Sequence, residues 1–300
     1  MTADRNHHVV PKAYLRGFAQ DDRVRLVYKY GNRPPEKIKH IKKSLVERGF
    51  LTVDTDSLRS DELEDAFARA ECQIFARTHL ISYPDVSPEQ AEAIKALGAL
   101  LFARSYRIRQ HSPRISREAI EERKMLAPRD RGLVQRFTRE KGRPPAPGEL
   151  ARMIEDFGDE FLSSGLALVT GILDVYRKAV AKFAPLHVSL YDARGLRHGL
   201  TTGDNPVVLA RGAGMRDVDN DRRVIAIGDA DTIYFPLNRW TGVCLTGQPE
   251  GHGRLGQREV LMMNNAMWRS AHRVVVAHPA EDWPSACSVS RDRPPSPTDF

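Results

Sequence analysis

Residues 7–19 read HHVVPKAYLRGFA, in which two histidines stand directly before a short apolar segment that carries Tyr14, Leu15 and Phe18. Adjacent residues of an extended chain point to opposite sides, so His7 and His8 cannot both face one site. A neutral imidazole there would serve as a metal ligand or a base, with a carboxylate on its other nitrogen. The alternative is a buried histidine bonded to a backbone carbonyl. The apolar residues predict that this segment packs against the C-terminal part of the chain.

Outward from this segment, the apolar pattern has the period of a strand at 23–30 and then that of helices. Helices are expected at 60–78, 89–110, 116–126, 129–141, 147–157 and 159–182. Short strands follow, at 186–191, 198–202, 206–210, 223–227, 231–236 and 241–246, before a helix at 257–272 and a strand at 273–277. This order predicts an α+β fold with an N-terminal strand segment, a helical middle and a C-terminal, mostly antiparallel sheet with a closing helix. We expect the N-terminal segment to join that sheet.

The clearest break in the chain is GRPPAPG at 142–148, which indicates a surface loop. It lies within a stretch of about 111–158 that we interpret as a helical insertion. Residues 1–284 are expected to form one domain. Residues 285–300 are rich in Ser, Arg, Asp and Pro and are expected to be a disordered tail.

Three further segments accompany HHVVPKAYLRGFA: TTGDNPVVL at 201–209, YFPLN at 234–238, and the closing helix around Asn264 and Asn265. Together they resemble the domain of unknown function 4238 family, over roughly residues 6–110 and 195–278. The resemblance names a family without naming a reaction, so it implies no activity, cofactor or catalytic residue.

The net charge of +7 is concentrated in two basic blocks. Residues 1–48 hold 12 lysines and arginines against 5 acidic residues, and residues 103–143 hold 13 against 5. Phosphate-rich partners bind such blocks by counterion release, which favours RNA or DNA as a partner. Solvated arginine-rich helices are the alternative, because the second block lacks the regular aromatic interleaving that is typical of proteins that stack single-stranded bases.

Neither a secretion signal nor an apolar run of 18 residues is present, so no membrane partner is expected and a cytoplasmic location is favoured. The widely spaced Cys72, Cys244 and Cys287 suit a reducing compartment. Residues 251–256, GHGRLG, fit a dinucleotide-binding pattern, but too few residues follow them to complete a doubly wound sheet. No nucleotide cofactor is therefore expected.

Glu64 and Glu71 fall within the apolar arc of the helix expected at 60–78. Carboxylates buried in this way need a cation, a metal or a hydrogen-bond donor. One interpretation makes them metal ligands. The other makes them structural partners of nearby arginines, above all Arg104 and Arg107.

Asp204 and Asn205 end a strand-like segment, where ligands and general bases often lie. The alternative is an Asx turn, in which the carboxylate of Asp204 accepts backbone N–H groups at a sharp corner. Asn264 and Asn265 lie on the closing helix, where a buried asparagine bridges loops or orients a substrate.

Two functions fit these residues. The first is a metal-dependent hydrolase of phosphodiesters, such as a nuclease in bacterial defence, with Mg²⁺ or Mn²⁺ as its metal. Its catalytic residues would be His7 or His8, whichever faces the site, with Asp204 and Asn205. Its metal ligands would be Glu64, Glu71 and Asp204, and its substrate-binding residues would be Arg16, Arg104, Arg107, Asn264 and Asn265. The second is a non-catalytic module that binds nucleic acid or protein, in which the same residues lock the fold.

Overall fold

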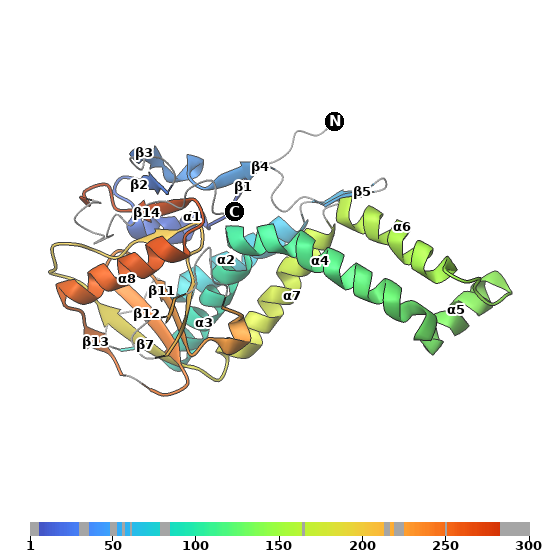
Figure 1. Cartoon of the computed structure of the whole chain (residues 1–300). Coiled ribbons are helices and arrows are strands. Elements are labelled where there is room, and N and C mark those ends of the chain that lie inside the picture. The colour runs from blue at the N-terminus through green and yellow to red at the C-terminus, as the bar shows by residue number, and fades with distance from the viewer. Residues whose placement is uncertain are drawn as a thin grey trace, which may run out of the picture.

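The computed structural model describes residues 6–29, 36–48, 53–55, 58–60, 62–78, 85–163, 166–212, 217–218, 225–249 and 251–282. Two sheets and the helices around them form a body, from which a helical arm projects (Figure 1). The fold is α+β, as the sequence predicts. None of the helices in the described ranges is long and apolar enough to cross a membrane.

The larger sheet has six strands in the order β10-β9-β11-β12-β7-β13, and every pairing except β13 on β7 is antiparallel. Alternation along β11 sends Phe235 to one face and Tyr234 to the other. The strands are β7 (His187–Asp192), β9 (Val208–Arg211), β10 (Asp217–Val218), β11 (Thr232–Pro236), β12 (Thr241–Thr246) and β13 (Gly253–Arg254).

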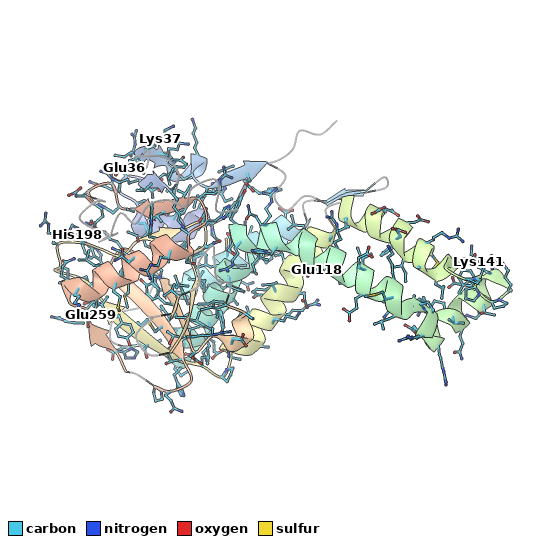
Figure 2. All side chains as sticks on the ribbon, in the orientation of Figure 1. Glu36, Lys37, Glu118, Lys141, His198 and Glu259 are labelled. Atoms are coloured by element: carbon cyan, nitrogen blue, oxygen red, sulfur yellow. The ribbon has the colours of Figure 1, made fainter. Side chains whose placement is uncertain are left out.

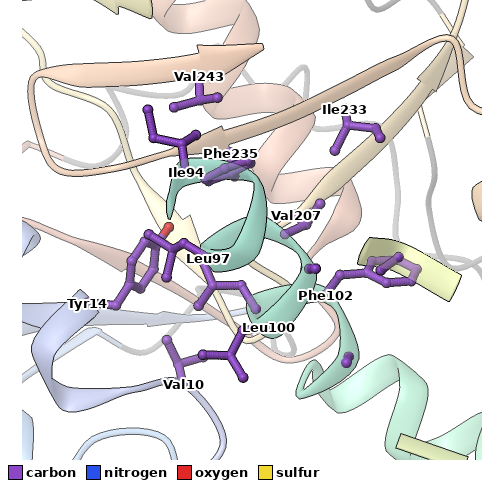
Figure 3. Packing of buried hydrophobic residues seen from close by; sticks show 14 of the residues in the cluster. Val10, Tyr14, Ile94, Leu97, Leu100, Phe102, Val207, Ile233, Phe235 and Val243 are labelled. Atoms are coloured by element: carbon purple, nitrogen blue, oxygen red, sulfur yellow. The ribbon is translucent and has the colours of Figure 1, made fainter. Parts of the chain in front are cut away.

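Helices cover both faces of this sheet. On the face of Tyr234, α8 (Gln257–Ser270) packs through Val260, Met263 and Met267. On the face of Phe235 lie α3 (Pro88–Ala103) and α7 (Leu166–Phe183), with Leu97 and Leu100 of α3 in the main core (Figure 3). Gly98 permits the close approach of α3, because a Cβ atom there would lie 2.8 Å from Cε1 of Phe235.

The smaller sheet has the order β3-β2-β14-β8 and joins the two ends of the chain. It consists of β2 (Arg23–Tyr28), β3 (Glu36–His40), β8 (Thr202–Gly203) and β14 (Val274–Ala277). The strand expected at 273–277 is β14, which belongs to this smaller sheet and not to the larger one. It pairs with N-terminal β2 in the register Val276↔Leu26. β1 (Asn6–His8) pairs with β4 (Val46–Arg48), and β5 (Val53–Thr55) with β6 (Leu58–Ser60).

The N-terminal segment packs against C-terminal strands, which confirms the prediction made from residues 7–19. It forms α1 (Lys12–Leu15) and a 3₁₀ turn, η1 (Arg16–Phe18). The hydroxyl of Tyr14 donates to the carbonyl of Pro236 at 2.7 Å and lies 3.0 Å from Oγ1 of Thr202. Leu15 and Phe18 are fully buried.

The helical arm spans residues 106–163 and includes the stretch interpreted as an insertion. It consists of α4 (Tyr106–Leu126), η3 (Ala127–Arg129), α5 (Arg131–Lys141) and α6 (Glu149–Ser163). Figure 2 places Glu118 on α4 and Lys141 near the far end of the arm. Ala127, Phe137 and Leu150 form a small core of the arm itself, separate from the core of the body. The remaining helical elements are α2 (Glu62–Thr78), η2 (Ile41–Lys43) and η5 (Ile227–Asp229).

Four sequence predictions of secondary structure are wrong. The strand expected at 198–202 is not formed, since β8 begins only at Thr202. The expected break between helices at residue 158 is absent, because α6 continues from Glu149 to Ser163.

The helix expected at 89–110 is broken between α3 and α4, because Ser105 is extended and its hydroxyl caps α4 by accepting from N–H of Ile108 at 3.4 Å. Of the strand expected at 223–227, the structure describes residues 225–227, and these do not form a strand, since η5 begins at Ile227. Residues 221–224 and the tail expected at 285–300 lie outside the described residues.

Candidate functional site

Asp204 is buried in the turn that follows β8, with 3% of its surface exposed. β8 pairs with β14, so this turn lies beside the chain that leads from α8 into β14. Oδ1 of Asp204 accepts from N–H of His272 at 2.8 Å. Oδ2 accepts from N–H of Arg273 at 2.7 Å and of Val274 at 3.2 Å. The carboxylate thus fixes the backbone of the α8–β14 turn.

The electrostatic setting of Asp204 agrees with this structural use. Burial raises the pKa of the carboxyl group above its ordinary value, and the backbone N–H groups reduce that rise. Each oxygen already accepts at least one hydrogen bond from the turn. Asp204 therefore accepts backbone N–H groups, as the second interpretation of its sequence context supposed, but the expected Asx turn is wrong, because its donors are residues 272–274 and not its own turn.

Asn205 joins the same turn to the start of the arm. Its Nδ2 donates to the carbonyl of Ser270 at 2.8 Å, and its Oδ1 accepts from N–H of Arg107 at 3.1 Å. The backbone carbonyl of Asp204 accepts from N–H of Tyr106 at 3.2 Å. Residues 204 and 205 thereby hold the first turn of α4 against the end of α8.

This junction brings an aromatic and basic surface together. The rings of Tyr106 and His272 are stacked, with centroids 4.8 Å apart and planes at 16°. The guanidinium of Arg273 lies 5.3 Å from the ring centroid of Tyr106 and donates to its hydroxyl at 3.0 Å. Nε2 of Gln110 lies 3.1 Å from Nε2 of His272. We call Tyr106, Gln110, His272 and Arg273 the stacking surface.

Positive charge predominates around the stacking surface. Glu47 of β4 pairs with both Arg109 and Arg273, the latter at 3.9 Å, so one carboxylate faces two guanidinium groups. Nζ of Lys29 lies 5.9 Å from the ring centroid of Trp268, two residues before the end of α8. The segments that build this region supply five basic side chains: Lys29, Arg107, Arg109, Arg269 and Arg273.

Glu71 and Arg104 form a separate, buried cluster. Arg104 is 1% exposed and ends α3; it pairs with Glu71 of α2 and donates to the carbonyl of His8. Its guanidinium also lies 5.4 Å from the ring centroid of Phe67. Arg104 therefore ties β1 and α2 to α3, as in the structural interpretation of Glu71, and does not face solvent as a substrate-binding residue would. The side chain of Glu64 lies outside the described residues.

The asparagines of α8 differ in their surroundings. Asn264 is fully buried, and its Oδ1 accepts from N–H of Thr201 at 2.9 Å while its Nδ2 donates to the carbonyl of Gly199 at 3.0 Å. Asn264 thus connects α8 to the segment that precedes β8. The neighbouring Asn265 is only half-buried. Arg16 is exposed beside Asp22, with 3.5 Å between Nε and Oδ1.

His7 and His8 differ in burial, as expected for neighbouring residues of an extended chain, whose side chains point to opposite sides. His7 is buried, and His8 is half-buried with Nε2 at 3.3 Å from the carbonyl oxygen of Ile41. Burial lowers the pKa of His8, and the carbonyl of Ile41 opposes that effect. Among the described residues, no three His, Cys, Asp or Glu side chains converge to hold a metal ion. Three or more of His7, His8, Glu71 and Asp204 therefore do not converge as metal ligands in the described structure.

Sequence reasoning missed the stacking surface and a second buried cluster. Glu281 is 2% exposed and accepts from Nδ1 of His198 at 3.2 Å, N–H of Gly199 at 3.1 Å and Nε of Arg239 at 2.9 Å. This cluster fastens the segment after β14 to the body; Figure 2 labels His198 there. Both sets join residues far apart in the chain, so no local sequence pattern marks them.

The chain belongs to the family described as Protein of unknown function (DUF4238), whose model matches residues 6–281. The match spans the body and the whole helical arm. No curated protein and no solved structure matches the chain.

Proposed function

We propose that this protein binds single-stranded nucleic acid, RNA or DNA, through the stacking surface. The observation that carries the proposal is the stacked pair of Tyr106 and His272, with Arg273 against the same tyrosine ring. Proteins that bind single strands combine aromatic rings, on which bases stack, with basic side chains that follow the phosphates. Both kinds of group meet here, at the junction of α4, α8 and β14.

Asp204 and Asn205 have a positioning role in this proposal. They touch no base; they hold the backbone of residues 272–274 and the first turn of α4 in register, and so keep the two rings stacked. A rigid platform loses little side-chain freedom when a base stacks on it. In this proposal the buried carboxylate of Asp204 serves binding by holding the backbone beneath the two rings.

The direct test measures binding of fluorescent single-stranded and duplex oligonucleotides to the parent protein and to Tyr106→Ala. Loss of one stacking contact of about 1–3 kcal/mol weakens single-strand binding by about 5- to 150-fold. The matched control is Trp240→Ala, because Trp240 also packs under an arginine, with 4.3 Å between the guanidinium of Arg239 and its ring centroid. Equal affinities for parent and Tyr106→Ala would contradict the proposal.

Salt dependence provides a second readout. Each neutralised phosphate of a single strand contributes about −0.7 to the slope of log affinity against log salt. Arg273→Gln is expected to make that slope shallower by about one phosphate, whereas Tyr106→Ala is expected to leave the slope unchanged and lower the affinity. A parent slope near zero would mean that the basic side chains contact no phosphate.

The metal-dependent hydrolase that the sequence favours stays a prediction. The described residues offer no observation that favours it, because Asp204 and Glu71 are engaged by the backbone of the α8–β14 turn and by Arg104. Incubating the oligonucleotides with the protein and Mg²⁺ or Mn²⁺ tests it directly. Metal-dependent cleavage would restore the enzyme as the main hypothesis.

A further inference from the structure

One carboxylate beside the stacking surface divides its two oxygens between two arginines. Oε2 of Glu47 forms an ion pair with Arg109 of α4, and Oε1 lies 3.9 Å from Nη1 of Arg273, which directly precedes β14. A phosphodiester also presents two oxygens, and guanidinium groups are its commonest side-chain partners. The carboxylate of Glu47 therefore lies where a phosphate group would fit.

Partial burial makes an anion necessary at this place. The side chains of Glu47 and Arg109 are only 27% and 29% exposed. Desolvation lowers the pKa of Arg109, because burial disfavours the charged form of the guanidinium. A cation in such a position is stable only with an anion close to it, and Glu47 supplies that anion.

Arg273 connects this pair of arginines to the stacking surface. Its side chain is exposed, and its guanidinium lies 5.3 Å from the ring centroid of Tyr106 and donates to the tyrosine hydroxyl at 3.0 Å. Proteins that bind single strands place basic groups along the phosphates of the bases that they stack. A base stacked at Tyr106 would therefore bring its phosphate to the guanidinium that Glu47 contacts.

We propose that Arg109 and Arg273 form a phosphate-binding site and that Glu47 is its internal competitor, which a phosphodiester of the bound strand displaces. The inference rests on the proposed function, because it locates one phosphate of that strand. A phosphodiester carries one negative charge, as Glu47 does, so the exchange leaves the charge of the site unchanged. Glu47 lowers the affinity for the strand, because two ion pairs have to break before the phosphate binds.

The competitor belongs to a smaller structural unit than the two arginines. Glu47 lies on β4, which has three residues and, within the described part of the chain, pairs with β1 alone. Arg109 lies in the first turns of the 21-residue α4, and Arg273 is fixed through the backbone bond from its N–H to Asp204. Rotation of the Glu47 side chain is therefore sufficient for the exchange, while both arginines keep their backbone positions.

The first test compares the binding of fluorescent oligouridylate and oligodeoxythymidylate by the parent and by Glu47→Gln. Glutamine keeps the size of the side chain and removes its charge. The affinity is expected to rise about 2- to 30-fold, because each of the two partly exposed ion pairs contributes a factor of about 1.4 to 5. If circular dichroism shows that this variant does not fold, Glu47→Asp replaces it; its shorter side chain keeps the charge but withdraws it, so a smaller rise is expected.

Glu149→Gln is the matched control. Glu149 also pairs with an arginine, Arg143, and its side chain is 25% exposed. It begins α6 beside the loop at the far end of the arm, away from the stacking surface (Figure 1). An affinity of Glu47→Gln equal to or below that of the parent, or an equal rise in Glu149→Gln, would refute the competition and leave the proposed function standing. If the parent and Glu47→Gln both fail to bind, the proposed function falls together with this inference.

A double-mutant cycle shows whether Glu47 acts through its arginines. In the Arg109→Gln background one ion pair is already absent, so Glu47→Gln is expected to raise the affinity by a smaller factor than in the parent. With both arginines present, Glu47→Gln is also expected to steepen the salt slope by about 0.7, the contribution of one phosphate of a single strand. An undiminished rise without Arg109, together with an unchanged slope, would mean general charge repulsion and would overturn the proposal.

Discussion

Replacing Asp204 with asparagine tests whether the carboxylate of Asp204 has a structural or a catalytic role. An asparagine oxygen can take the place of Oδ2 and keep the bonds from Arg273 and Val274. Its NH₂ group then occupies the place of Oδ1 and meets the N–H of His272, where the present distance is 2.8 Å. Two donors face each other at a site that is 3% exposed. One unpaired buried donor costs about 1–3 kcal/mol, a sizeable part of a total stability of about 5–15 kcal/mol.

Urea unfolding in EDTA, Mg²⁺ and Mn²⁺ measures this effect. We expect Asp204→Asn to lower the unfolding free energy by the same amount in all three solutions. Asp156→Asn is the control, because that carboxylate is exposed on α6. The opposite result would be a parent stabilised by metal, by about 2.7 kcal/mol at 100 times the dissociation constant, and a mutant of equal or higher stability that has lost this response. That result would refute the structural role and support a metal site at Asp204.

Three further substitutions test the anchoring of the N-terminal segment and the packing of α3. Tyr14→Phe leaves the buried carbonyl of Pro236 without its donor and should cost about 1–3 kcal/mol in urea unfolding; an unchanged midpoint would contradict the observed hydrogen bond. Burial lowers the pKa of His8 in the folded state below the ordinary value of 6.5. Above about pH 6.5 the imidazole is neutral in both states and His8 does not reduce stability. As the pH falls from there towards the lowered pKa, the unfolded state binds the proton first and the folded state loses stability. His8→Gln should therefore flatten the stability profile in acid, and a profile identical to that of the parent would exclude His8 as its source. Gly98→Ala places a methyl group 2.8 Å from the ring of Phe235 and should cost about 1–3 kcal/mol, whereas a neutral effect would mean that α3 shifts without penalty.

Local patterns were sufficient to predict the α+β class, most of the helices and the burial of the N-terminal segment. Tyr14, Leu15 and Phe18 stand together in a short apolar segment, and burying such a cluster is favourable whichever element covers it. The helices of the middle follow from apolar spacing in the same way. The break between α3 and α4 was not predicted, because a capping serine at residue 105 interrupts a helical pattern without changing its polarity.

The candidate site could be predicted only in part. The Asp204–Asn205 corner is visible in the sequence, since an Asp and an Asn between a glycine and a proline are typical of a turn. Its partners are not visible, because N–H groups of residues 272–274 become available only where β14 pairs with β8. The same pattern was therefore compatible with a ligand, a base or a backbone acceptor.

Sequence alone determined that this protein has basic blocks, an anchored N-terminus and a polar corner at residues 204–205. Only the tertiary structure decided that Tyr106 stacks on His272 across 166 positions of the chain, and that Glu71 meets Arg104 instead of Asp204. The physical reason is the range of the forces involved. Secondary structure depends on neighbours within about one helical turn or one strand pair, whereas a binding surface depends on which distant elements pack together.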